Sequence, residues 1–126
     1  MSTMIRTGRL TAAVAAASLA GLLLVGPALA QTQEGTASFY SDKFEGKKTA
    51  SGQAYDKSAL TASHKKLPYG TKVQVTNLAN GKSVVVTVND RMAQSNKSVI
   101  ELSRKAAEEL DFTKSGKTKV KLEVQK

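Results

Sequence analysis

Apolar and polar residues alternate along the stretch Val84–Arg91, which reads VVVTVNDR. This period of two in a β-branched run predicts a strand with at least one buried face. Counting on by two from Val86 and Val88 puts Asp90 on the same face, at the point where the apolar stripe ends. A carboxylic acid at the edge of an apolar interior has its charged form disfavoured, as a general acid requires. Asp90 is therefore a candidate catalytic acid, and the alternative is an ordinary turn residue at the end of the strand.

The same alternation predicts strands at Lys72–Asn77 and Lys119–Gln125. Asn80-Gly81 predicts a tight hairpin between Lys72–Asn77 and Ser83–Asn89, because both central positions of a type I′ turn need positive φ. Shorter and weaker patterns predict further strands at Gly35–Tyr40, Ser58–His64 and Val99–Leu102.

One helix is expected, with Ser103 as its N-cap and Leu110 near its end. Its buried face is small and consists of Ala106, Ala107 and Leu110. Ser41–Tyr55 is rich in Gly, Ser, Lys and Thr and predicts a long loop, while Gln31–Glu34 predicts a disordered leader. Five or six short strands and one helix predict a mainly β fold, a small β-barrel.

The first 30 residues have the pattern of a secretory signal peptide. Arg6 and Arg9 precede the apolar run Leu10–Val25, and Ala28-Leu29-Ala30 is a small-residue cleavage signal. We therefore expect export to the periplasm or the exterior and a single domain over residues 31–126. A retained membrane anchor is the alternative, since Leu10–Ala30 is nearly long enough to span a bilayer. A lipid anchor is not expected, because the chain has no cysteine.

The formal net charge of +9 falls to +7 when Arg6 and Arg9 are removed with the leader. Such a balance favours anionic partners through long-range attraction, although it also describes a generically basic soluble surface. After export, an anionic cell-wall polymer is a better candidate partner than nucleic acid. We expect a monomer that holds together by packing, without disulfides.

The chemistry-bearing residues are few. His64 is the only histidine and cysteine is absent, so a zinc site is not expected. No phosphate-binding glycine loop and no nucleophile-elbow pattern is present, and no cofactor is indicated. Four aromatic residues lie between Phe39 and Tyr55. Tyrosine combines a flat apolar ring with a polar tip, which suits it to sugar rings as well as to interfaces.

These residues together carry a family resemblance. From Gly35 to about Phe112 the chain resembles the RlpA-like (rare lipoprotein A) double-psi β-barrel domain, which is also similar to the barrel of expansins. The matching segments occur in the family's order and spacing: GTASFY at 35–40, TASGQAYD at 49–56, TASHKKLPYGT at 61–71, VQVTNL at 73–78, NGKSVVVTVNDR at 80–91 and IELS at 100–103.

The resemblance implies a six-stranded double-psi β-barrel with one short helix, and an exported protein that cuts peptidoglycan glycan strands as a lytic transglycosylase. It implies that Asp90 and His64 are the catalytic residues. Substrate-binding positions implied alongside them are Gln53, Tyr55, Asp56, Tyr40 and Arg91. The sequence departs from the family at Gln53, where members have an acidic residue, at Phe39, where they have Trp, and at Met92–Gln94.

Three hypotheses follow. In the first, Asp90 protonates the departing glycosidic oxygen and then accepts the proton of a substrate hydroxyl that attacks internally, while His64 holds Asp90 or the sugar. It predicts that the side chains of Asp90 and His64 converge in one groove, about 3 to 6 Å apart, with Gln53 or Tyr55 beside them. The second is a non-catalytic, expansin-like module that binds wall glycan, favoured by Gln53. The third is a barrel that binds another protein, for example as an inhibitor.

Overall fold

The structure is a computed structural model and describes residues 32–126. The predicted signal peptide, residues 1–30, lies outside the described residues. Within residues 32–126, no helix has the length and apolar character needed to cross a membrane.

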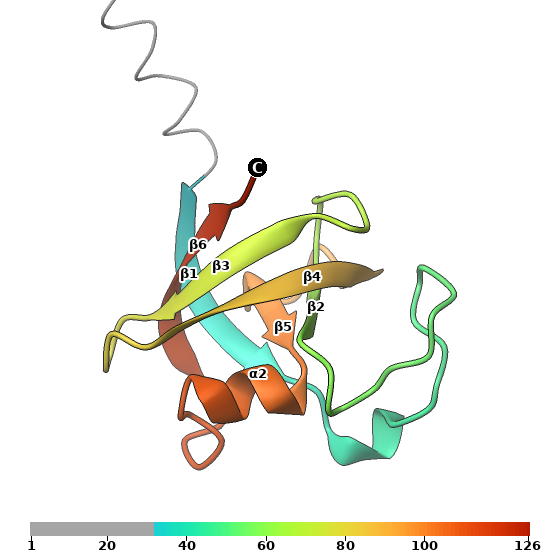
Figure 1. Cartoon of the computed structure of the whole chain (residues 1–126), viewed down its shortest axis with the longest axis horizontal. Helices are drawn as coiled ribbons and strands as arrows, with labels where there is room; N and C mark the ends of the chain where they lie inside the picture. Colours follow the sequence, from blue (N-terminus) through green and yellow to red (C-terminus); the bar gives the residue numbers. More distant parts are fainter. Residues whose placement is uncertain (1–31) are drawn as a thin grey trace, which may run out of the picture. The chain divides into compact units, whose positions relative to one another are not determined.

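In the described part of the chain, six strands close into one barrel in the order β1-β5-β2-β4-β3-β6. Two neighbouring pairs, β1–β5 and β2–β4, are parallel and the other four are antiparallel. This mixed, closed sheet (Figure 1) confirms the predicted six-stranded double-psi β-barrel. The strands are β1 (Thr32–Phe39), β2 (Thr61–His64), β3 (Lys72–Asn77), β4 (Ser83–Arg91), β5 (Ile100–Leu102) and β6 (Thr118–Val124).

The one α-helix of residues 32–126, α2 (Arg104–Glu109), begins at its predicted cap, where the Ser103 hydroxyl accepts a hydrogen bond from the N–H of Ala106. Its buried residues include Ala106 and Ala107, as predicted, and Leu110 at its C-cap is also fully buried. A short 3₁₀ turn, η1 (Asp42–Phe44), was not predicted and opens the long loop after β1.

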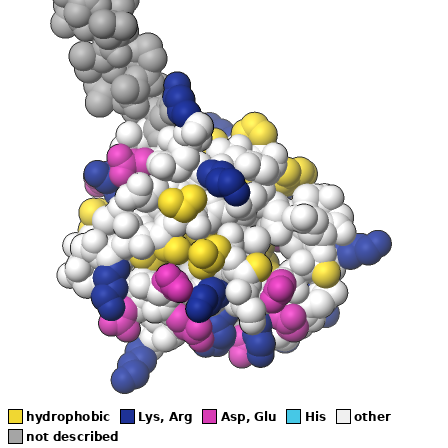
Figure 2. All heavy atoms as spheres, in the orientation of Figure 1, with side chains coloured by type: hydrophobic (Ala, Val, Ile, Leu, Met, Phe, Trp, Pro, Cys, Tyr) yellow, Lys and Arg dark blue, Asp and Glu magenta, His cyan; other side chains and the backbone are white. Residues whose placement is uncertain are grey.

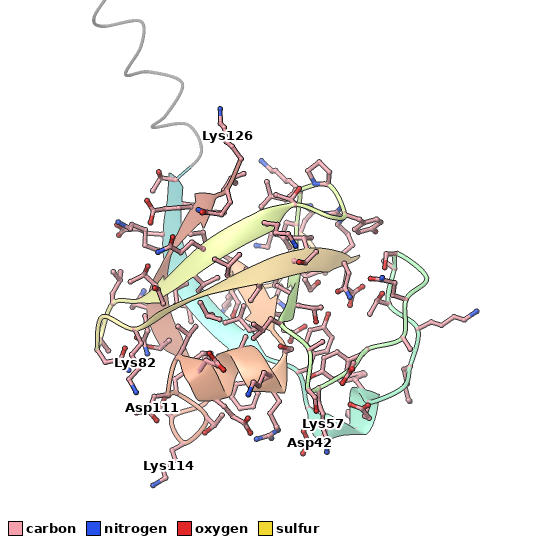
Figure 3. All side chains as sticks on the ribbon, viewed as in Figure 1. Asp42, Lys57, Lys82, Asp111, Lys114 and Lys126 are labelled. Carbon is pink, nitrogen blue, oxygen red and sulfur yellow. The ribbon has the colours of Figure 1, made fainter. Side chains whose placement is uncertain are left out.

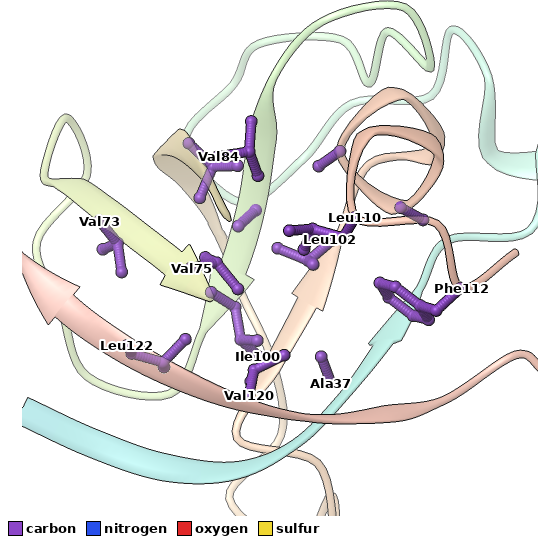
Figure 4. Packing of buried hydrophobic residues seen from close by; sticks show 14 of the residues in the cluster. Ala37, Val73, Val75, Val84, Ile100, Leu102, Leu110, Phe112, Val120 and Leu122 are labelled. Atoms are coloured by element: carbon purple, nitrogen blue, oxygen red, sulfur yellow. The ribbon is translucent and has the colours of Figure 1, made fainter. Parts of the chain in front are cut away.

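The core is built from the alternating apolar positions of the strands and from the inner face of α2 (Figure 4). Val84, Val86 and Val88 of β4 are buried while Val85 between them is 41% exposed, so the predicted alternation is confirmed. The other apolar strand residues with less than 3% exposure are Ala37, Ala62, Val73, Val75, Ile100, Leu102, Val120 and Leu122.

The hairpin between β3 and β4 is present, but its predicted type I′ turn is wrong. Gly81 has φ of 80°, whereas Asn80 is not among the positive-φ residues. The N–H groups of Asn80 and Gly81 both bond to the carbonyl of Asn77, at 3.3 and 2.7 Å. The connection is therefore a longer loop, Leu78–Lys82, that needs positive φ at the glycine alone.

The predicted disordered leader is also wrong for Thr32–Glu34, which form the start of β1. These residues pair with β6, with Thr32 opposite Glu123 and Glu34 opposite Lys121. The partner strand lies about 90 residues further along the chain, and such a long-range pairing leaves no local signal in a short polar segment.

Gly35 in β1 is required by a close approach. A Cβ at this position would overlap the side chain of Val99. We expect Gly35→Ala to lower the free energy of unfolding by about 1–3 kcal/mol, as overpacked substitutions do. Urea unfolding of Gly35→Ala and of Gly35→Ala with Val99→Ala tests this. The second change removes the atoms that clash, so the double variant should lose less than the two single losses combined; simple additivity would contradict the steric explanation.

Candidate active site

The long loop after β1 is ordered by its own hydrogen bonds into a small hairpin beside the barrel. The N–H of Gly46 bonds to the carbonyl of Tyr55 at 2.8 Å, and the N–H of Tyr55 bonds to the carbonyl of Lys47 at 2.7 Å. At its base, the guanidinium of Arg104 bonds to Asp42, which is labelled in Figure 3, at 2.7 Å. This segment was predicted only as a loop, and in the structure it forms a wall over the end of β4.

An irregularity in the sheet turns Asp90 toward this wall. Ala62 of β2 is opposite Val88 of β4, but the next residue, Ser63, is opposite Asp90, so Asn89 is an extra residue in β4. Because paired residues share a face, Asp90 lies on the side of Ser63, outside the barrel interior. The predicted parity of Asp90 with the buried valines is therefore wrong, although Asp90 is half-buried as expected.

The carboxylate of Asp90 accepts three hydrogen bonds. The hydroxyl of Tyr40 donates to Oδ2 at 2.5 Å, and the N–H groups of Ala50 and Arg91 donate to Oδ1 at 2.8 Å each. Asp90 is thereby held in place from the loop, from its own strand and from the end of β1.

A pocket of about 270 Å³ opens between the loop and the barrel beside Asp90. Tyr40 and Tyr55 form one side of it as a stacked pair, with ring centroids 4.3 Å apart and planes 12° apart. Burial is the main cause that raises the pKa of both tyrosines, and for Tyr40 the bond to Asp90 adds to it. Phe44, which is 39% exposed, contacts Tyr40 edge-on. The full lining is Tyr40, Phe44, Lys47, Lys48, Thr49, Tyr55, Asp90 and Glu101.

Glu101 is a second carboxyl group in this pocket, and sequence reasoning missed it. Burial raises the pKa of Glu101, and the charge of Asp90 adds to the effect. Its position between two core residues, Ile100 and Leu102, could have indicated that its side chain faces away from the core. That the outward face meets Asp90 depends on strand pairings that the sequence does not show.

His64 lies on the other face of the sheet. It is opposite Ile100 of the core, and its Nε2 is 3.0 Å from Gln33 Oε1, which lies opposite Leu122. Its Nδ1 accepts hydrogen bonds from the N–H groups of Lys66 and Leu67. Both ring nitrogens thus have other partners, and the prediction that the side chains of His64 and Asp90 meet in one groove is wrong. The strands β2 and β4 lie side by side as predicted, but the side chains of His64 and Asp90 point to opposite faces of the sheet.

The bonding of His64 predicts a pH dependence of stability. Burial lowers the pKa of His64 from its ordinary 6.5, and the charges of Arg91, Lys65 and Lys66 add to the effect. The unfolded chain then binds a proton more readily than the folded one, so stability is complete above pH 6.5 and falls as the pH drops below it. The slope contributed by this group is at most about 1.4 kcal/mol per pH unit.

Urea unfolding between pH 5 and 8 measures this effect. His64→Gln, which has no titrating ring, should be less stable at pH 8 and should show a flatter profile below pH 6.5. Identical profiles for the two proteins would contradict the assignment of a buried neutral imidazole.

The remaining predicted substrate-binding residues lie around the pocket or away from it. Gln53 is exposed at the loop tip, and its Oε1 accepts a hydrogen bond from the side chain of Asn89 at 3.3 Å. Asn89 is the residue that precedes Asp90. Asp56 caps a turn by accepting the N–H of Ser58. Arg91 donates to the carbonyl of His64 and stacks over the exposed ring of Tyr69 at 4.7 Å. Tyr40 and Tyr55 line the pocket, whereas Asp56 and Arg91 do not.

Charge is mixed over the face shown in Figure 2. Basic side chains are scattered there, and acidic ones gather along the lower edge, where Figure 1 places α2 and η1. Lys47 and Lys48 are the basic residues that line the pocket with the two carboxyl groups. Over residues 32–126, no group of three or more His, Cys, Asp or Glu side chains could hold a metal ion.

Comparison with known proteins places this geometry among related barrels. A family model described as lytic transglycolase matches residues 32–122. The endolytic peptidoglycan transglycosylase RlpA of Campylobacter jejuni is 47% identical over 97 residues, which cover 77% of this chain and 35% of the relative. The chain thus spans about a third of the length of that relative.

Two solved structures share the fold. A mutant of the Clavibacter michiganensis expansin in complex with cellohexaose superposes with a TM-score of 0.61 at 19% identity, over 75% of this chain and 50% of that one. The Streptomyces papain inhibitor superposes with a TM-score of 0.58 at 22% identity, over 76% and 96%. At these identities the likeness concerns the fold alone.

Proposed function

Because the chain belongs to the lytic transglycolase family of double-psi β-barrel domains, we propose that it cleaves peptidoglycan glycan strands as a lytic transglycosylase. The observation that carries this proposal is the pocket in which Asp90 and Glu101 lie beside the stacked rings of Tyr40 and Tyr55. Its volume of about 270 Å³ is at the small end for ligand sites, so a polymer would have only part of its length enclosed.

In this reaction the nucleophile belongs to the substrate. The C6 hydroxyl of an N-acetylmuramic acid unit attacks its own C1, the bond from C1 to the glycosidic oxygen breaks, and a 1,6-anhydro sugar forms without consuming water. The attacking hydroxyl must lose a proton and the departing oxygen must gain one. A base and an acid are therefore both needed at the scissile bond.

Asp90 serves as the base. Three hydrogen-bond donors hold its carboxylate in the pocket, where it can accept the proton of the attacking hydroxyl. The sequence-based hypothesis gave Asp90 the acid step as well as the base step. The pocket holds a second carboxyl group, Glu101, so the two steps need not fall on one residue.

Other residues near Asp90 bind the sugar or position the strands. Phe44 is the most open ring of the pocket and stacks on the sugar, while the nearly buried Tyr40 and Tyr55 shape the wall behind it. His64 positions the end of β2 through its bonds to the turn after that strand, and Gln53 positions Asn89 next to Asp90. The protein works in the cell envelope, on the periplasmic or outer side, as the predicted signal peptide implies.

Incubation of the protein with purified peptidoglycan sacculi tests this function. Soluble fragments that end in 1,6-anhydro-N-acetylmuramic acid, identified by mass spectrometry, are the expected result. Fragments with free reducing ends would indicate a hydrolase instead.

One observation favours a second candidate, an expansin-like module that binds glycan without cutting it. Gln53 replaces the family's acidic residue at the edge of the site, and an expansin with bound cellohexaose shares the fold. Sedimentation with sacculi at low and high salt distinguishes the two functions. Binding at both salt concentrations with no released fragments would favour the module over the enzyme.

A further inference from the structure

A row of side chains crosses four strands on the outer side of the barrel. Ser38 of β1 is opposite Glu101 of β5, Glu101 is opposite Ser63 of β2, and Ser63 is opposite Asp90 of β4. Glu101 and Asp90 therefore flank Ser63 on the same face, with backbones about 10 Å apart, which is twice the strand spacing. Both side chains reach the pocket under the loop.

The two carboxyl groups have different surroundings. Asp90 is held by three hydrogen-bond donors. Glu101 is half-buried and faces the negative charge of Asp90. Burial, and to a lesser extent this charge, raises the pKa of Glu101. A carboxyl group whose pKa is raised by burial and by a facing charge is suited to donate a proton.

We propose that Glu101 is the catalytic acid of this site, paired with Asp90 as the base. This inference rests on the proposed function, and it adds a catalytic residue that the sequence patterns did not indicate. The carboxyl proton of Glu101 passes to the glycosidic oxygen as the bond to C1 breaks. The proton of the attacking C6 hydroxyl passes to Asp90, so one proton leaves the pair and one enters it. Exchange with solvent restores the starting state.

Other charged and titratable groups face Glu101 from the elements packed around it. Two ammonium groups of the loop line the same pocket, and the tyrosine hydroxyls stay neutral because burial raises their pKa values. The charged and titratable residues that line the pocket together with Glu101 are Asp90, Tyr40, Tyr55, Lys47 and Lys48. To act as the acid, the carboxyl group of Glu101 must carry its proton when substrate binds.

The test compares two substrates that differ in their need for an acid. Glu101→Gln should lose about 10²–10⁴-fold in kcat/KM on peptidoglycan, whose leaving oxygen needs a proton. On the 4-nitrophenyl glycoside of the peptidoglycan disaccharide, whose leaving group departs unprotonated, the same variant should stay within about 10-fold of wild type. Glu123→Gln, which removes a carboxylate on β6 outside the pocket, should match wild type on both.

Each other outcome has a defined meaning. If Glu101→Gln loses kcat/KM equally on both substrates, or loses none on peptidoglycan, the acid role of Glu101 is overturned. Anhydro products from the wild type would still support the proposed function. A wild type that makes no anhydro product would overturn the proposed function, and the acid role with it.

A second measurement does not depend on turnover. The ¹³C chemical shift of the Glu101 carboxyl carbon, followed against pH in the whole chain, should give a midpoint above the ordinary value for glutamate. In Asp90→Asn that midpoint should fall, since the facing charge is gone. An ordinary midpoint in the wild type, unmoved by Asp90→Asn, would overturn the proposal.

Discussion

Asp90→Asn should reduce the formation of anhydro products by about 10²–10⁴-fold, the range over which a positioned acid or base contributes. The amide cannot accept a proton from the attacking hydroxyl at neutral pH. It can still accept the N–H of Ala50 through its oxygen, so the loop should remain docked. Rates on sacculi, with the melting temperature as a check of folding, give the comparison.

The matched control is Asp111→Asn. This substitution makes the same chemical change at an exposed carboxylate after α2. The positive φ of 59° at this position also suits asparagine. Its rate should equal that of the wild type. A loss in Asp90→Asn no larger than in Asp111→Asn would contradict the catalytic role of Asp90, and retained binding to sacculi would then favour the glycan-binding module.

Asn77→Ala should be the most destabilising single change, lowering the free energy of unfolding by about 2–3 kcal/mol. Asn77 is 1% exposed and joins three elements. Its Nδ2 donates to the carbonyl of Leu110, and its Oδ1 accepts from the N–H of Ala79 and the hydroxyl of Thr118, at 2.8 to 3.0 Å. The alanine variant leaves a buried acceptor and donors without these partners, and the expected fall in melting temperature is roughly 10–20 °C.

Asn80→Ala is the control for this effect. Its Nδ2 donates to the same Leu110 carbonyl at 3.0 Å, but Asn80 is exposed, so water can replace the lost bond. Urea unfolding of both variants should show a several-fold larger loss for Asn77→Ala. Equal losses would mean that the buried polar contacts contribute little and that the explanation is wrong.

Most of the fold could be predicted from the sequence, because the strands with one apolar face carry a clear period of two. Lys72–Asn77 was predicted with the observed bounds, and the helix cap at Ser103 was correct. The start of β1 could not be predicted, since Thr32–Glu34 gains its structure only by pairing with β6. The turn at Asn80-Gly81 was misassigned because one positive φ, at Gly81, is enough for the longer loop.

The site was predicted less completely, for a geometric reason. One extra residue in β4, Asn89, reverses the face on which Asp90 lies, and nothing in the run VVVTVNDR indicates it. Asp90 was singled out by an alternation that this extra residue breaks and by the family resemblance, while its neighbours in the site are Tyr40 and Glu101 and not His64. A bulge depends on the neighbouring strand, so alternation within one strand cannot show it.

The central claim is that a hydroxyl of the substrate, and not water, attacks the glycan in the pocket of Asp90 and Glu101. Digestion of sacculi in H₂¹⁸O, followed by mass spectrometry of the released fragments, tests it most directly. The account predicts 1,6-anhydro ends that carry no ¹⁸O, with yields that collapse in Asp90→Asn. Fragments with ¹⁸O-labelled reducing ends, or anhydro fragments formed equally well by Asp90→Asn, would contradict it.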